Sequence, residues 1–235
     1  MLIGRGTGFS VAVFAVVTLS LPAIGASDNT LRRDKGIVTF EVAGGTPVSL
    51  TGEVAVGNAV IASTSIATLA TLTLRDSSEI RIGDRTTVRV GDLTAAAAGS
   101  PASGTIYLQR GAVRFNVTHP TGATANYRFV TPTTQVAVRG TVGYFVAGPT
   151  GNQIYCVKCE AGDVTITTAT QQVSLRSGQT LNVNLQHGAI TGTQVVANRT
   201  INNPAIDQFL GGVSPFGESA ITGADITGSG SGLRF

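Results

Sequence analysis

Short runs in which apolar and polar residues alternate are the feature that most constrains this chain. Such alternation places every second side chain on one face of an extended strand, whereas an amphipathic helix repeats its apolar residues every three or four positions. Turn-forming residues separate the runs, as in Gly83-Asp84 and Ser177-Gly178. The clearest runs are Leu72–Leu74, Ile80–Ile82, Val88–Val90, Ile106–Leu108, Val113–Val117, Val136–Val138, Val164–Ile166 and Leu181–Leu185. The sequence therefore predicts an all-β protein, a twisted β-solenoid-like stack or meander of short strands in a single domain.

Residues 1–26 have the composition of a secretory signal peptide. An apolar stretch runs from Phe9 to Leu21, and small residues follow it up to Ala26. A membrane-spanning helix needs about 20 apolar residues, and Pro22 ends the run before that length. We therefore expect cleavage after Gly25 or Ala26 and export to the periplasm or outside the cell, with no membrane span after cleavage. An uncleaved membrane anchor is the alternative.

The remainder of the chain divides into three parts. Residues 27–62 form a charged leader and the first strands, and residues 63–185 carry the main β domain. Residues 197–235 form a Gly-rich tail that we expect to be flexible. Within this tail, Asn203 is placed to cap one helical turn.

Charge and composition argue against several classes of function. The 16 basic and 13 acidic residues leave a net charge of +3, and only 12% of residues are charged, too few for the dense positive surface that binds nucleic acid. Two Cys and two His are too few for a His- or Cys-rich metal site. His119 and His187 both lie beside turn residues. We therefore expect no nucleic acid partner, no metal, no cofactor and no catalytic residue.

Cys156 and Cys159 form a Cys-x-x-Cys motif, which serves redox or zinc chemistry in other contexts. Residues three apart in an extended strand lie about 10 Å apart on opposite faces, beyond the reach of a disulfide. Unless a turn begins by Lys158, the two thiols should stay unbridged. The same alternation places Tyr155, Val157 and Cys159 on the inward face, with Cys156 and Lys158 outward.

Arginines outnumber carboxylates in the central region. The arginines are Arg75, Arg81, Arg85, Arg89, Arg110, Arg114, Arg128 and Arg139, and the carboxylates are Asp76, Glu79, Asp84 and Asp92. These arginines could form a basic stripe for an anionic envelope polymer or an acidic partner. We favour the simpler interpretation of solvated strand faces with cross-strand ion pairs, each contributing well under ~1 kcal/mol.

Four motifs occur in the order that is typical of a FecR domain. They are the turn Asp76-Ser77-Ser78, the strand start Gly111-Ala112-Val113, the segment Thr131-Pro132 and the corner Arg139-Gly140-Thr141. The chain therefore resembles the FecR family over residues 63–185. Its structural signature comprises Thr131, Pro132, Arg139, Gly140 and Thr141. Gly140 is expected at a corner that needs positive φ.

The resemblance implies a twisted β module and a link to envelope signalling. The regulators that gave the family its name also carry a cytoplasmic anti-sigma segment, whereas only eight residues precede Phe9 here, and Ser77 stands where the family usually has Gly. We expect an exported, non-enzymatic FecR-type module that acts by interaction with an envelope protein or polymer in cell-surface signalling. The alternatives are a transmembrane-anchored signalling regulator and a secreted hydrolase whose site forms across strands.

Overall fold

The computed structural model describes residues 29–42, 44–94, 102–118, 125–197 and 203–210, and most of them lie in β-strands. Within these ranges, seventeen strands form one hydrogen-bonded system that is folded into two facing sheets, which we name sheet A and sheet B. The predicted all-β class is confirmed.

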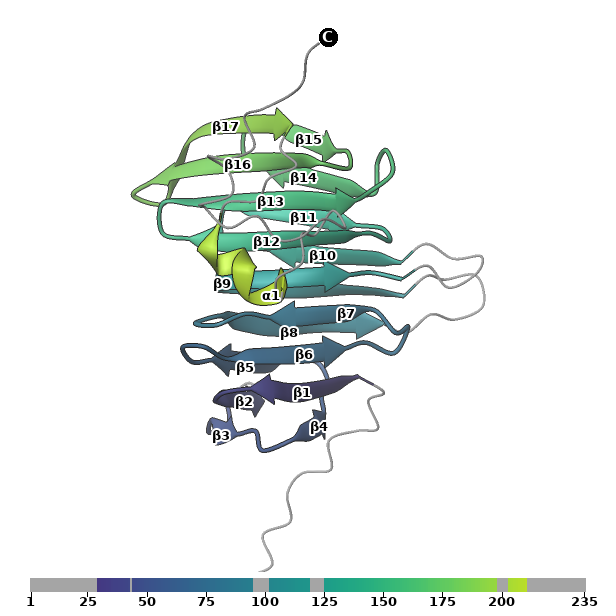
Figure 1. Cartoon of the computed structure of the whole chain (residues 1–235), viewed down its shortest axis with the longest axis vertical. Coiled ribbons are helices and arrows are strands. Elements are labelled where there is room, and N and C mark those ends of the chain that lie inside the picture. The colour runs from purple at the N-terminus through teal and green to yellow at the C-terminus, as the bar shows by residue number, and fades with distance from the viewer. Residues whose placement is uncertain (1–28, 43, 95–101, 119–124, 198–202, 211–235) are drawn as a thin grey trace, which may run out of the picture.

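Each sheet has a fixed spatial order of strands, counted from the amino-terminal end of the stack. Sheet A consists of β4 (Glu53–Ala55), β1 (Thr30–Lys35), β6 (Leu69–Thr73), β7 (Glu79–Ile82), β9 (Ser103–Asn116), β12 (Val142–Gly148), β13 (Gly151–Lys158), β16 (Gln179–Gln186) and β17 (Ala189–Ala197). Sheet B consists of β3 (Val48–Ser49), β2 (Val38–Val42), β5 (Val60–Thr64), β8 (Thr87–Thr94), β9, β10 (Asn126–Val130), β11 (Thr134–Val138), β14 (Val164–Thr168) and β15 (Gln172–Leu175). The strands run across the molecule and stack along its long axis (Figure 1). Among these pairings, only that of β9 with β10 is parallel.

The long strand β9 joins the two sheets. Its first part pairs with β8 and β10 in sheet B, and its last part pairs with β7 and β12 in sheet A. The strand passes from one sheet to the other at Gly111, whose φ is +95°. A Cβ atom at this position would lie 2.2 Å from Oγ1 of Thr86, so the crossing requires glycine. The Thr86 hydroxyl fixes the crossing because it accepts a hydrogen bond from the Ala112 N–H at 2.9 Å.

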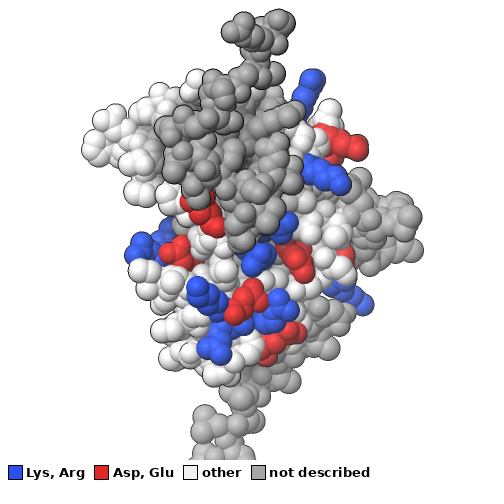
Figure 2. All heavy atoms as spheres, in the orientation of Figure 1, with Lys and Arg blue, Asp and Glu red and all other residues white. Residues whose placement is uncertain are grey.

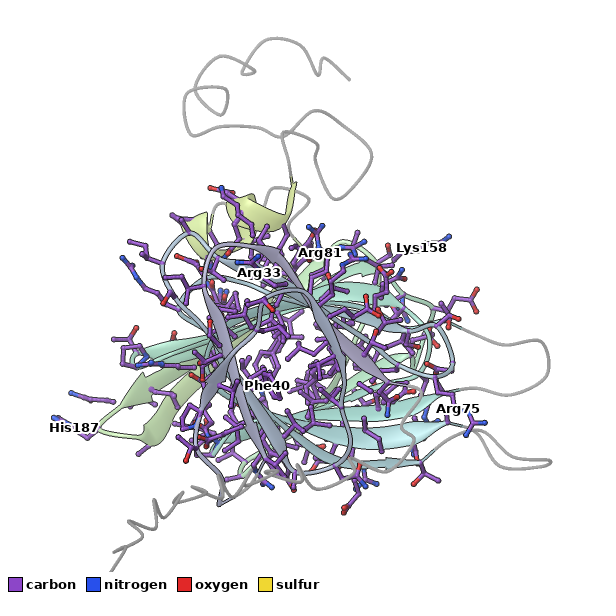
Figure 3. All side chains as sticks on the ribbon, turned by 90° about the horizontal axis from the view of Figure 1, so that it is seen from below. Arg33, Phe40, Arg75, Arg81, Lys158 and His187 are labelled. Atoms are coloured by element: carbon purple, nitrogen blue, oxygen red, sulfur yellow. A yellow bond between two sulfur atoms is a disulfide. The ribbon has the colours of Figure 1, made fainter. Side chains whose placement is uncertain are left out.

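The main core lies between the inner faces of the two sheets. Phe115 from sheet A and Phe129 from sheet B are fully buried there, and their ring centroids lie 5.1 Å apart. Figure 3 views the molecule from its amino-terminal end and shows Phe40 between the sheets. Alternate residues of each strand therefore face this core, as the period of two in the sequence predicts.

After β9 the chain builds hairpins in the two sheets in turn. The hairpins β10–β11 and β14–β15 belong to sheet B, and the hairpins β12–β13 and β16–β17 belong to sheet A. The chain must therefore cross between the sheets after β11 and again after β13. These two crossings lie side by side, because the Arg139 N–H donates a hydrogen bond to the Asp163 carbonyl at 2.8 Å.

A short helix, α1 (Pro204–Leu210), covers part of the outer face of sheet A. Asn203 caps it, since its Oδ1 accepts a hydrogen bond from the Ala205 N–H at 2.9 Å, and Pro204 takes the first helical position, where no N–H is needed. Ile206 and Phe209 are buried, and the Phe209 ring lies 5.9 Å from that of Tyr144.

The helix corrects one part of the sequence-based expectation. Residues 203–210 fall within the tail 197–235 that was expected to be flexible, yet they pack against the sheet because Ile206 and Phe209 bury apolar surface. Residues 198–202 and 211–235, the Ala-rich segment 95–101 and residues 1–26, where the sequence predicts a signal peptide, lie outside the described residues. In the part of the chain that is described, no helix has the length and apolar character needed to cross a bilayer.

Candidate functional site

Thr131 organises the hairpin turn between β10 and β11. Its hydroxyl donates a hydrogen bond to the Thr134 carbonyl at 3.3 Å and accepts hydrogen bonds from the Thr134 N–H at 3.1 Å and the Asn152 side chain at 3.2 Å. Thr131 is buried, and Pro132 is exposed at the tip of the turn. In this arrangement, Thr131 holds the turn and links it to β13 in sheet A.

The residues Arg139, Gly140 and Thr141 form the crossing from β11 to β12. Gly140 has a φ of +93°, a conformation that L-residues with a side chain rarely adopt. The buried Thr141 hydroxyl donates a hydrogen bond to the Lys158 carbonyl and lies 2.8 Å from Sγ of Cys159. The signature corner is therefore bound to the crossing that follows β13.

Cys156 and Cys159 are joined in a disulfide at this crossing, with their Cα atoms 6.0 Å apart. The prediction that they stay unbridged is wrong, because β13 ends at Lys158 and the chain turns there. A register shift opposite Val142 and Gly143 adds an extra residue to β13 just before this end. The extended spacing assumed from the sequence therefore does not apply.

The predicted faces of Tyr155, Cys156 and Val157 in β13 are also wrong, whereas Cys159 packs against the main core and Lys158 is exposed as expected. Cys156 belongs to the main core between the sheets, whereas Tyr155 and Val157 pack in a separate cluster with Ile206 and Phe209 of α1. Tyr155 and Val157 are buried although they lie on the outer face of sheet A, because α1 covers that face. The expectation failed because burial on the covered outer face looks like burial in the core, and because the register shift interrupts the alternation at Val157.

An open groove of about 510 Å³ lies at this corner, beside the disulfide. It is lined by Asn116, Val117, Gly140, Thr141, Val142, Lys158, Cys159, Glu160, Asp163 and Ser177. The Asp163 carboxylate accepts a hydrogen bond from the Glu160 N–H at 2.8 Å, and the Ser177 hydroxyl donates one to the Val157 carbonyl at 2.6 Å. The polar groups of the groove thus largely hold its own backbone in place.

The described residues contain no group of three or more His, Cys, Asp or Glu that could hold a metal ion. His187 lies at the tip of the β16–β17 hairpin, far from the groove (Figure 3), and His119 is outside the described residues. The structure therefore brings the corner Arg139-Gly140-Thr141 together with the cysteine pair, whereas Thr131 and Pro132 lie at the other end of β11 and His187 lies apart from both.

The arginines do not form one stripe, because the strands distribute them over both outer faces. Arg81 and Arg114 lie on sheet A, whereas Arg89 and Arg128 lie on sheet B. Arg89 places its guanidinium 3.9 Å from the centroid of the Tyr107 ring. The ion pair found within the described ranges, Arg32 with Asp34 at 2.8 Å, lies along one strand rather than across two.

One row of side chains crosses the amino-terminal half of sheet A on its outer face. Successive cross-strand neighbours in this row are Glu53, Arg32, Thr71, Arg81 and Arg114. We name this row, together with Asp34 and Glu79 beside it, the charged face. Figure 2 shows positive and negative side chains gathered on the lower part of this side of the molecule. Arg33 and Arg81 lie on the same side of the ribbon as α1 (Figure 3).

The row continues from Arg114 to Tyr144, where α1 begins to cover the sheet. Burial raises the pKa of the Tyr144 hydroxyl above its usual value, and the positive charges of Arg114 and Arg81 partly oppose that shift. In the register of the strands, Arg114 is the cross-strand neighbour of Tyr144, and Arg81 lies one strand further along the row. Arg32 and Tyr144 carry no signal in the sequence, because only the strand register places them in one row with Arg81 and Arg114.

The sequence model of the FecR protein family matches residues 61–165, which run from β5 to β14 and include the whole signature. This chain contains a FecR domain. FecR domains occur in the periplasmic parts of envelope signalling proteins, and the family is generally regulatory. The family match therefore gives this chain a signalling-related context.

Solved structures that are similar to this chain include two crystal structures, at 1.65 and 2.50 Å resolution, of a protein from Parabacteroides distasonis ATCC 8503 that is described as "a putative anti-sigma factor". Each is 16% identical in sequence with a TM-score of 0.46, and the alignment covers 57% of this chain and 58% of that chain. The similarity thus spans less than two thirds of that protein. No curated protein sequence matches this chain.

Proposed function

We propose that this FecR-domain protein is exported and acts without catalysis, by binding a protein partner in cell-surface signalling. The charged face is the observation that carries this proposal. It presents side chains of both signs in register across five strands, with Glu53 beside Arg32 and Glu79 on the same strand as Arg81. Mixed charges in a fixed pattern suit recognition of a protein surface, since electrostatic complementarity fixes orientation and excludes wrong partners.

The shape of the charged face supports the same proposal. Its residues lie on strands of an open sheet surface, whereas enzymes enclose small substrates in concave pockets. A rigid β scaffold also holds these side chains in place before a partner binds, which lowers the entropic cost of association. An envelope polymer is the alternative partner, and a uniformly positive surface would favour it more than this mixed one does.

The proposal is tested by replacing the export signal and the charged face separately. In a strain that lacks the gene, residues 27–235 behind an unrelated export signal should restore the phenotype. The same exported chain with Arg32→Ser and Arg81→Ser should be folded but fail to restore it. A control with Arg89→Ser and Arg128→Ser, on the outer face of sheet B, should restore it. Equal activity of both double variants would refute the charged face as the functional surface.

A further inference from the structure

We infer that Arg81, Arg114 and Tyr144 form a binding site for a phosphate group, free or carried as a phosphomonoester. The site lies at the carboxyl-terminal end of the charged face, beside α1. This inference goes beyond the proposed function, because phosphate binding concerns a single chemical group and can be measured on the isolated protein. A protein partner could bind the charged face even if this site bound no phosphate.

The register of the strands places the two arginines directly opposite each other. Arg81 of β7 is the cross-strand neighbour of Arg114 of β9, and both side chains are half-buried on the outer face. Directly opposed residues in antiparallel strands have Cβ atoms about 5 Å apart, and like charges in such positions destabilise the sheet. Within the described part of the chain, no carboxylate oxygen lies within ion-pair distance of either guanidinium.

Two other arginines on described strands have a partner of their own. Arg32 is paired with Asp34, and Arg89 stacks on Tyr107. Arg81 and Arg114 have neither kind of partner, and the buried Tyr144 lies directly opposite Arg114 on the next strand of the row. Two guanidinium groups and a phenol therefore supply N–H and O–H donors along one short row of the outer face. An oxyanion there would neutralise the repulsion between the two charges and accept these hydrogen bonds.

The charge of the site favours phosphate over a carboxylate. Two guanidinium groups carry two positive charges, which a phosphate dianion or a phosphomonoester neutralises, whereas a carboxylate neutralises one. Guanidinium groups also match the geometry of phosphate oxygens with paired N–H donors. Two carboxylates oppose this charge: Glu79 lies two residues from Arg81 on the same face of β7, and Asp34 accepts a hydrogen bond from Thr71, the cross-strand neighbour of Arg81. Glu79 lies on the same strand as Arg81. Its negative charge weakens binding, so Glu79→Gln should strengthen it.

The test is titration of the purified protein by isothermal calorimetry with inorganic phosphate, methyl phosphate and acetate at constant ionic strength. We expect one phosphate per chain and weaker binding of acetate. Arg81→Gln and Arg114→Gln should each weaken phosphate binding about tenfold or more, the effect of losing one charge-assisted contact. Arg128→Gln is the matched control, because Arg128 lies opposite Ala137 on sheet B and should leave binding unchanged. Tyr144→Phe keeps the ring against Phe209 and should weaken binding less.

The outcomes separate the possible sources of the phosphate. Equal binding of methyl phosphate and inorganic phosphate assigns the site to a phosphomonoester on a larger molecule, and binding of inorganic phosphate alone assigns it to the free ion. Absence of phosphate binding, equal binding of acetate, or binding that survives Arg81→Gln would overturn the inference. None of these results would decide whether the charged face binds a protein, which the complementation test measures.

Discussion

Replacement of Gly111 by alanine should destabilise the protein strongly, because this residue carries β9 from one sheet to the other. Gly111 has a φ of +95°, and an alanine in such a conformation costs about 1–2 kcal/mol. The new Cβ atom would also lie 2.2 Å from Oγ1 and 2.6 Å from Cα of Thr86. Because Thr86 is buried and its backbone cannot move freely, overpacking adds about 1–3 kcal/mol. The expected loss is therefore about 2–5 kcal/mol.

Gly162 offers a matched control for this prediction. Its φ of +91° is nearly the same, but a Cβ atom there would meet nothing within 4 Å. Gly162→Ala should therefore lower the free energy of unfolding only by the about 1–2 kcal/mol of its strained backbone conformation. Urea unfolding followed by circular dichroism measures both free energies of unfolding. Equal losses for the two variants would show that the contact with Thr86 does not constrain the crossing, and the account of β9 would be refuted.

Three further predictions concern the signature corner, the disulfide and alkaline pH. Gly140→Val should lower the melting temperature, because a β-branched residue is strained at a φ of +93°; an unchanged melting temperature would contradict the structural role of this corner. Reduction of the Cys156–Cys159 disulfide should lower the free energy of unfolding by about 2 kcal/mol or less, since the closed loop is short. Mass spectrometry of the unreduced protein should find no free thiol, and two free thiols would contradict the structure. Burial and the hydrogen bond to Asp76 raise the pKa of the Tyr127 hydroxyl, so the folded state favours the neutral phenol. The free energy of unfolding should therefore fall as pH rises above about 10. Tyr127→Phe should reduce that fall, and an identical alkaline profile for the variant would argue against this cause.

The sequence pattern predicts local features of this fold well. The run Ile80–Ile82 lies in β7, Val136–Val138 lies in β11, and Gly140 has the positive φ expected of it. Each of these depends on the alternation of a few neighbouring residues or on the backbone freedom of glycine. The turn at Asp76 is similar, since its carboxylate accepts a hydrogen bond from the Ser78 N–H at 2.9 Å.

Features that depend on distant contacts could not be predicted in the same way. The Cys156–Cys159 bridge requires a register shift that arises only when β13 pairs with β12. The burial of Tyr155 on its outer face requires α1, which begins at Pro204. The Arg81–Arg114 pair is likewise set by the register of β7 against β9 rather than by the neighbours of either residue in the sequence.

Site-specific photo-crosslinking in living cells tests the proposed function most directly. A photoreactive residue at Thr73 would lie on the outer face of sheet A beside Glu79, and one at Thr165 would lie on the outer face of sheet B. Both threonines are half-buried on strands, so the two positions report contacts equally well. The account predicts a discrete crosslinked protein from position 73 that disappears with Arg32→Ser and Arg81→Ser, and none from position 165. The same adducts from both positions, or an adduct at 73 that persists in the double variant, would contradict it.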